Sequence, residues 1–420
     1  MSPFVIALLV AANIGLIYAL LALPLGLRSI RLSVRINASR QRLWSALWPL
    51  GDDAAWSGEI LAVDRTADGD SLLRMRLGWE GRDGMPIERS VALEDVVEGE
   101  RYTLRVVDDT SLDPAFWSDY RETVEFAGGD AGAGTYVTLG RTDRYRGLAF
   151  LVFRYFALRR QRAKLKLWAE TGRYRKGGLF EHPLSHAGFA LLSVVLLWPL
   201  FGLDFGGLVL ASALTAAVFL HELGHLAAFR LMRHRRVRMI FIPILGGIAI
   251  GGRPYDSRFE VAFVALMGAG FSAFLVPIMI AISNAATSSG AAGLSAWFAA
   301  LAGCAALFNI ANLVPVWKFD GGQVLRQLFV RPLTLAVASF VLLSAFLVLA
   351  AAAGFPRHAL VAAGAVFALL SLITGGQSWK PRKELKPISG REQLAVAAAL
   401  AAVFAIHGYG VLWAAAKLAA

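Results

Sequence analysis

Residues 207–230 read GLVLASALTAAVFLHELGHLAAFR, an apolar run that contains two histidines and a glutamate. The run is long enough to cross a bilayer, which takes about 20 apolar residues. His221 and His225 are four positions apart and share one face of a helix, so both imidazoles can bind a single metal ion. Glu222 can then reach a water molecule beside the metal and accept its proton. Polar groups in lipid cost several kcal/mol unless they are paired or metal-bound. The segment therefore predicts a metal site inside the membrane.

The third metal ligand is expected from another segment, because hydrolytic zinc sites usually have three protein ligands and one open position. Asp320 is the best candidate, since it follows Asn312-Leu-Val-Pro315-Val-Trp-Lys-Phe and precedes Gly321-Gly322. The proline and the paired glycines break the helix and allow a close backbone approach. The remaining histidines are expected at surfaces or interfaces. The ligand types favour one zinc ion over iron or manganese.

The composition agrees with a membrane protein. The chain has 420 residues, of which 57% are hydrophobic and only 17% are charged, whereas soluble domains average about 25% charged residues. Its single cysteine excludes a disulfide framework. About eight spans are expected, at 4–27, 185–203, 207–230, 260–283, 293–315, 333–353, 358–375 and 393–415. The fold class predicted is a polytopic α-helical membrane protein with an additional soluble α+β domain.

The net charge of +12 reflects topology and not a nucleic-acid partner. Residues 1–182 hold 25 Lys/Arg and 23 Asp/Glu, whereas residues 183–420 hold 17 and 7. The cations of the apolar half fall in alternate loops, as cytoplasmic loops require. This pattern predicts an integral protein of a bacterial inner membrane, with segment 4–27 as an uncleaved anchor, the N-terminus outside and the soluble domain in the cytoplasm.

The soluble domain is expected within residues 31–170, where charges return and strand-like runs alternate with Gly/Asp-rich turns. Residues 37–47 predict a short capped helix, and residues 147–170 a long closing helix. The closing helix carries a basic face that either contacts anionic headgroups or is simply solvated. The predicted domains are an anchor at 1–27, a cytoplasmic domain with its linker at 28–182, a membrane core at 183–330 and additional spans at 331–420.

The two motifs together resemble the site-2 protease family of intramembrane zinc metalloproteases. The matching residues are His221-Glu222-Leu-Gly-His225 and Asn312-Leu-Val-Pro315-Val-Trp-Lys-Phe-Asp320-Gly321. The resemblance covers about residues 183–330. It implies zinc bound by His221, His225 and Asp320, with Glu222 activating water for cleavage of a transmembrane protein substrate. It also places Asn312 at the family's motif asparagine, whose amide is expected either to bind substrate backbone or oxyanion, or to join two helices.

Segment 239–252 (MIFIPILGGIAIGG) corresponds to a membrane-embedded hairpin near the family's active site. Its strand edge is expected either to pair with an unwound substrate or to serve packing alone. No PDZ signature is present, although many family members carry that domain. Residues 31–170 are instead similar to a START-like helix-grip domain, through a strand that leads into Asn37-Ala-Ser-Arg-Gln-Arg-Leu-Trp44, further strands and the closing helix.

Such a domain implies a cavity for a small apolar ligand, or a binding site for the tail of the substrate. The candidate lining residues are aromatic: Trp44, Trp56, Trp79, Trp117 and Phe153. Each of them is individually expected to be ordinary core. Two alternatives to a protease stay open. One is a non-catalytic membrane receptor with a structural zinc and a lipid-binding domain, which a fourth protein ligand would favour. The other is a metal-dependent enzyme that acts on lipid.

Overall fold

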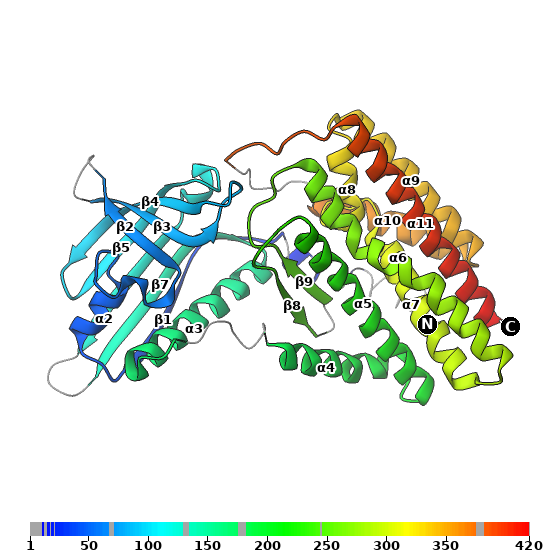
Figure 1. Cartoon of the computed structure of the whole chain (residues 1–420), viewed down its shortest axis with the longest axis horizontal. Helices are drawn as coiled ribbons and strands as arrows, with labels where there is room; N and C mark the ends of the chain where they lie inside the picture. Colours follow the sequence, from blue (N-terminus) through cyan, green and yellow to red (C-terminus); the bar gives the residue numbers. More distant parts are fainter. Residues whose placement is uncertain are drawn as a thin grey trace. The chain divides into compact units, whose positions relative to one another are not determined.

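The computed structural model describes residues 11, 15–16, 18–20, 22–66, 71–128, 134–174, 182–243, 246–374 and 382–419. The chain divides into two compact units (Figure 1). The first comprises residues 1–177 with 376–384, and the second residues 178–375 with 385–420. The first unit is an α+β domain and the second is helical apart from one hairpin.

The first unit contains a seven-stranded antiparallel sheet of order β1-β7-β6-β5-β4-β3-β2. Its strands are β1 (Pro24–Ile36), β2 (Ile60–Arg65), β3 (Leu72–Glu80), β4 (Pro86–Val97), β5 (Arg101–Asp109), β6 (Arg121–Gly128) and β7 (Thr135–Arg146). Two short 3-10 helices, η1 (Ala54–Ser57) and η2 (Pro114–Trp117), lie in its loops. β4 was not among the strands expected from the sequence. β1 begins at Pro24, so the last four residues of the predicted anchor belong to the sheet; of its other residues the structure describes 11, 15–16 and 18–20, which are helical, and 22–23.

Two helices complete this domain. α2 (Arg40–Leu47) is the predicted capped helix, and its N-cap Ser39 accepts a hydrogen bond from the Arg42 N–H. α3 (Leu148–Thr171) runs along one face of the sheet (Figure 1). Its buried residues Leu158, Leu165 and Ala169 join the sheet's hydrophobic core. A curved antiparallel sheet closed by one long helix is the helix-grip arrangement, so the predicted fold of this domain is confirmed.

The second unit contains six described helices that are long and apolar enough to cross a membrane. They are α4 (Pro183–Phe201), α5 (Phe205–Leu231), α6 (Arg258–Ser288), α7 (Ala292–Asn312), α9 (Pro332–Ala352) and α11 (Gly390–Ala419). The predicted span 358–375 corresponds to α10 (Arg357–Thr374), whose apolar stretch among the described residues, Arg357–Phe367, is shorter. These helices are those of an integral membrane protein.

Two elements interrupt the helical unit next to α5 and α6. β8 (Arg238–Ile242) and β9 (Gly246–Ile250) form the predicted hairpin, and β9 lies along α5. α7 ends at Asn312 instead of running to 315, because Pro315 cannot continue it. A tight turn then leads into α8 (Asp320–Leu328), a short helix that the sequence did not predict. The turn and α8 place Asp320 against α5, the helix that carries both histidines.

Candidate metal centre

α5 presents both histidines of the HExxH pattern inside the helical unit. The exposed fractions of His221 and Glu222 are only 3% and 7%. The Nε2 atoms of His221 and His225 lie 3.1 Å apart. The helical spacing of four residues therefore aims both imidazoles at one point, as the sequence predicted.

Asp320 supplies the third ligand atom of the cluster. Its Oδ2 atom lies 3.1 Å from the Nε2 atom of His221 and 3.4 Å from that of His225. Two glycines make this approach possible. A Cβ on Gly321 would lie 1.9 Å from the carbonyl oxygen of Leu313, and one on Gly322 equally close to that of Val316. Only glycine fits where the start of α8 stacks on the preceding turn.

The tautomers of both histidines follow from their Nδ1 contacts. The Nδ1 atom of His225 lies 2.7 Å from the carbonyl oxygen of Val264, which can only accept a hydrogen bond. The Nδ1 atom of His221 lies 2.7 Å from Oδ1 of Asn309, whose amide nitrogen already donates to Ala305. Both Nδ1 atoms are therefore donors, and in the neutral rings both Nε2 atoms carry lone pairs.

The three facing atoms fit a metal ion. They are two lone-pair nitrogens and a carboxylate oxygen, and the buried Oδ2 of Asp320 has no hydrogen-bond partner. Ligands about 2.0–2.1 Å from a tetrahedral zinc ion lie about 3.3–3.4 Å from each other, close to the observed 3.1–3.4 Å. Among the described residues, no fourth His, Cys, Asp or Glu atom joins the group. The set suits zinc with one position left for a small molecule.

Glu222 lies beside this cluster without belonging to it. The backbone of β9 covers its side chain so closely that a Cβ on Gly247 would lie 2.3 Å from Cγ of Glu222. The Ala249 backbone also hydrogen-bonds Glu222. The carboxylate is thus held between the metal ligands of α5 and the hairpin, as a base for a water molecule at the centre requires.

Asn312 and Asn309 occupy different places. The Asn312 amide donates to the Phe308 carbonyl one turn earlier in its own helix, at 3.0 Å. Asn309 is completely buried and contacts His221. Asn309 was not predicted as a site residue from the sequence, where its only signal is a polar residue one turn before the motif asparagine, in an apolar helix.

The aromatic residues proposed as the lining of one cavity in the helix-grip domain have different surroundings in the structure. Trp44 stacks on Trp48 in the core, at 5.0 Å between ring centroids. Trp117 is buried under the Arg89 guanidinium, whereas Trp79 and Phe153 are 41% and 57% exposed. Four of the five aromatic residues lie on helices or 3-10 helices and only Trp79 lies on a strand, so the sequence alone does not predict which rings share a space.

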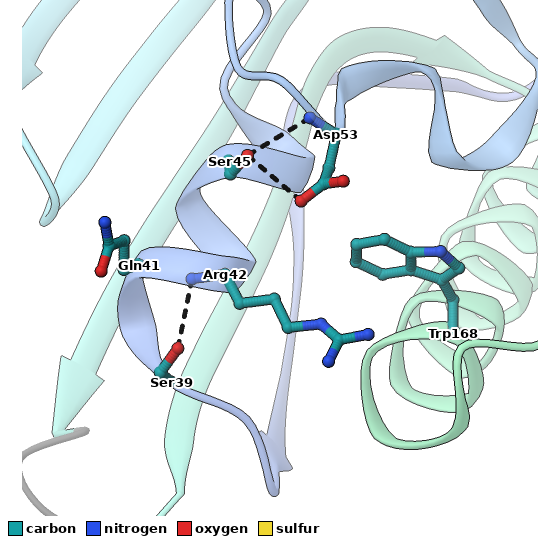
Figure 2. A pocket seen from close by; sticks show the side chains of 6 residues that line it. All are labelled: Ser39, Gln41, Arg42, Ser45, Asp53 and Trp168. Carbon is teal, nitrogen blue, oxygen red and sulfur yellow. Dashed lines mark hydrogen bonds between the residues drawn. The ribbon is translucent and has the colours of Figure 1, made fainter.

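The domain has a hollow elsewhere, between the start of α2 and the end of α3 (Figure 2). Its volume is ≈ 350 Å³, and it is lined by Ser39, Gln41, Arg42, Ser45, Asp53 and Trp168. The Arg42 guanidinium lies 5.2 Å from the centre of the Trp168 ring, and Ser45 is hydrogen-bonded to Asp53. Five of the six lining residues are polar, so this hollow does not match the predicted apolar ligand.

Comparison with known proteins finds only distant likenesses to solved structures, each over about a third of the chain. No protein-family model and no curated protein matches the chain. Among solved structures, the Aha1 dimer from Colwellia psychrerythraea is 14% identical with a TM-score of 0.27; the match covers 36% of this chain and 99% of that one. A START superfamily protein from Mycobacterium smegmatis is 14% identical with a TM-score of 0.24, covering 33% and 92%. Likenesses this distant carry no argument about function.

Proposed function

We propose that this protein is an intramembrane zinc metalloprotease of the site-2 protease type, which hydrolyses peptide bonds in or near the transmembrane helix of a substrate protein. The observation that carries the proposal is the set of three converging ligand atoms of His221, His225 and Asp320, with the carboxylate of Glu222 beside it. His221, His225 and Asp320 hold the zinc ion. When bound, the ion polarises a peptide carbonyl and lowers the pKa of water.

Glu222 performs the proton transfers. It accepts a proton from the attacking water and returns it to the leaving amine. Its contact with the Ala249 backbone fixes the carboxylate against β9. A structural zinc site has no use for such a carboxylate. The absence of a fourth ligand among the described residues likewise favours the enzyme over the receptor with a structural zinc.

β9 offers a place for the substrate backbone. In an antiparallel pair, the N–H and C=O of one residue point to the same side. The Ala249 N–H points at Glu222. The backbone N–H and C=O groups of residues 247 and 249 therefore point away from β8. Among the described strands, β9 pairs with β8 alone. A substrate segment added along this edge would lie beside Glu222, and helices must unwind before their peptide bonds can be attacked.

We also propose a location and a role for the helix-grip domain. The loop charges favour a helix-grip domain in the cytoplasm of a bacterium, with the N-terminus outside the inner membrane. There the domain binds a ligand or the cytoplasmic tail of the substrate and so regulates cleavage. The Asn312 amide is one turn from His221's partner Asn309, and we assign it to the substrate backbone.

The test compares wild type with Glu222→Gln in reconstituted membranes that contain tagged single-span substrates. Zinc content is measured for both proteins, and Glu384→Gln, an exposed carboxylate in the segment before α11, is the matched control. We expect Glu222→Gln to retain zinc and to abolish cleavage, while the control cleaves normally. Cleavage that survives in Glu222→Gln would refute the assignment of the base. If wild type and both variants bind zinc but none of them cleaves any member of a broad substrate panel, the alternative of a receptor with a structural zinc would be favoured.

A further inference from the structure

The long helix of the helix-grip domain is packed in an unusual way. The first ten residues of α3, LAFLVFRYFA at 148–157, are its most apolar part, yet none of them is buried. The first buried residue is Leu158, and the more polar second half contributes Leu165 and Ala169 to the core. A helix that only closed a soluble domain would place its apolar end on the sheet.

The unburied side chains form one apolar patch on the start of α3. The exposed fractions are 37% for Leu148, 50% for Val152, 57% for Phe153, 40% for Tyr155 and 47% for Phe156. Arg154, within the same stretch, is turned inward and lies over the Tyr120 and Phe150 rings. Contiguous apolar surface of this kind marks a site of contact with a protein or a membrane.

The patch starts where the predicted anchor ends. The Gly147 N–H, immediately before α3, donates to the carbonyl oxygen of Leu23 at 2.8 Å. The Arg146 side chain donates to the carbonyl of Ala22 at 3.2 Å. Leu23 is the last residue before β1 in the uncharged apolar segment 4–27. If that segment crosses the bilayer, α3 begins at the membrane surface.

Charge then changes along the helix axis. Arg159 is exposed and lies 11 residues after Leu148, which is about 16 Å along a helix. Arg28, in β1 and a few residues beyond the anchor, is also exposed. Interfacial helices bury their apolar residues about 5–10 Å deep in the boundary between headgroups and acyl chains. Cations beyond that depth meet the anionic headgroups.

We propose that residues 148–156 of α3 form a wedge that inserts into the lipid interface where the anchor leaves the membrane, with Arg28 and Arg159 on anionic headgroups. The wedge fixes the helix-grip domain to the bilayer surface at a second point besides the covalent anchor. The inference is independent of the proposed protease activity, because it uses residues of the first unit alone.

The test uses the full chain in vesicles of phosphatidylcholine and phosphatidylglycerol. Cys304 is first replaced by serine, and single cysteines at Phe153 and Phe156 then carry an environment-sensitive fluorophore. The matched control is Leu61 on β2, which is 54% exposed and lies at the sheet edge opposite β1. A phosphatidylcholine with a nitroxide near the top of its acyl chain serves as the quencher. Zinc content and tryptophan fluorescence confirm that each variant is folded.

We expect blue-shifted emission and strong nitroxide quenching at 153 and 156, and neither at 61. Quenching at 153 and 156 that is no greater than at 61 would overturn the proposal. Blue-shifted emission without such quenching would mean that protein, and not lipid, covers the patch. When phosphatidylglycerol is left out of the vesicles, quenching at position 153 should fall in the protein that keeps Arg28 and Arg159. In the protein that also carries Arg28→Gln and Arg159→Gln, quenching should be the same with and without phosphatidylglycerol. If quenching in the protein that keeps both arginines is the same with and without phosphatidylglycerol, the role of the cations would be refuted.

Discussion

The Nδ1 atom of His221 lies 2.7 Å from the Oδ1 atom of Asn309, and both side chains are buried. The contact fixes the imidazole so that Nε2 faces His225 and Asp320. Partners of this kind set the tautomer and orientation of a metal-binding histidine. α7, which supplies no metal ligand, therefore takes part in building the centre.

Replacing Asn309 with leucine is expected to weaken zinc binding about 10–100-fold, the usual cost of losing such a partner. Asn309→Asp keeps the acceptor oxygen and should retain most of the affinity. The measurement is competition with a zinc chelator of known affinity in detergent. Asn312→Leu is the matched control in the same helix, since the Asn312 amide contacts only the Phe308 carbonyl. Equal zinc affinity in Asn309→Leu and wild type would contradict the role of this contact.

Gly268 on α6 lies directly against the two histidines of the candidate metal site. A Cβ there would lie 2.5 Å from Nε2 of His225 and 2.6 Å from Cε1 of His221. Gly268→Ala is therefore expected to displace both rings and to abolish zinc binding, while the protein still inserts into membranes. Metal analysis of purified protein measures the loss.

Gly270→Ala provides the control, since a Cβ at that position meets nothing nearer than the flexible Met267 sulfur, at 3.4 Å. It should bind a full equivalent of zinc. Normal zinc content in Gly268→Ala would show that α6 can move away from the histidines. The close packing at Gly268 would then not be required for zinc binding.

The two motifs predicted which three side chains converge, because each motif acts locally. His221 and His225 share a helix, so their spacing alone sets their geometry. Asp320 follows a proline and precedes two glycines, which predict a break at that point. The helix-grip domain was predictable from its succession of strands and its closing helix. These features require no knowledge of which helices touch.

Asn309 and Gly268 were missed because their roles depend on contacts between helices. A glycine in an apolar helix has many packing roles, and only the position of α5 shows that Gly268 faces His225. The surroundings of the aromatic residues likewise depend on contacts between elements. Trp44 and Trp117 are both core residues, but they pack with different partners.

A buried ionic cluster joins the end of α5, the base of the hairpin and the start of α6. The Glu260 carboxylate faces Nε2 of His234 at 2.8 Å and accepts from Arg253 at 2.7 Å. Arg253→Leu leaves a buried carboxylate without its guanidinium, and we expect a loss of about 3–5 kcal/mol in unfolding free energy. Thermal denaturation in detergent reports the change.

The double variant Arg253→Leu/Glu260→Leu should recover much of that stability, because the uncompensated charge is gone. Arg235→Leu, an exposed arginine of the same region, is the control and should be neutral. A double variant less stable than Arg253→Leu alone would show that Glu260 is held mainly by His234 and the backbone.

Asp143 on β7 gives the helix-grip domain a dependence on pH. The side chain is 7% exposed, and burial raises its pKa, an effect only partly offset by Arg154 at 3.6 Å. A carboxyl group whose pKa is raised by folding favours the native state in its protonated form. The contribution of Asp143 to the stability of the folded domain is therefore most favourable below the ordinary aspartate pKa of about 3.9. That contribution is lost as the pH rises through the raised value.

Asp143→Asn removes the cost of burying the charge and keeps an oxygen for the Arg144 N–H, which lies 2.8 Å from the carboxylate. We expect the variant's helix-grip domain to be more stable than wild type at pH 7, with the difference shrinking as the pH falls toward 4. Urea-dependent proteolysis of the full chain at several pH values measures it. Asp64→Asn, whose side chain is 62% exposed, should show no difference at any pH. If Asp143→Asn is less stable than wild type at pH 7, the ion pair with Arg154 outweighs burial, and the direction assigned to the pKa is wrong.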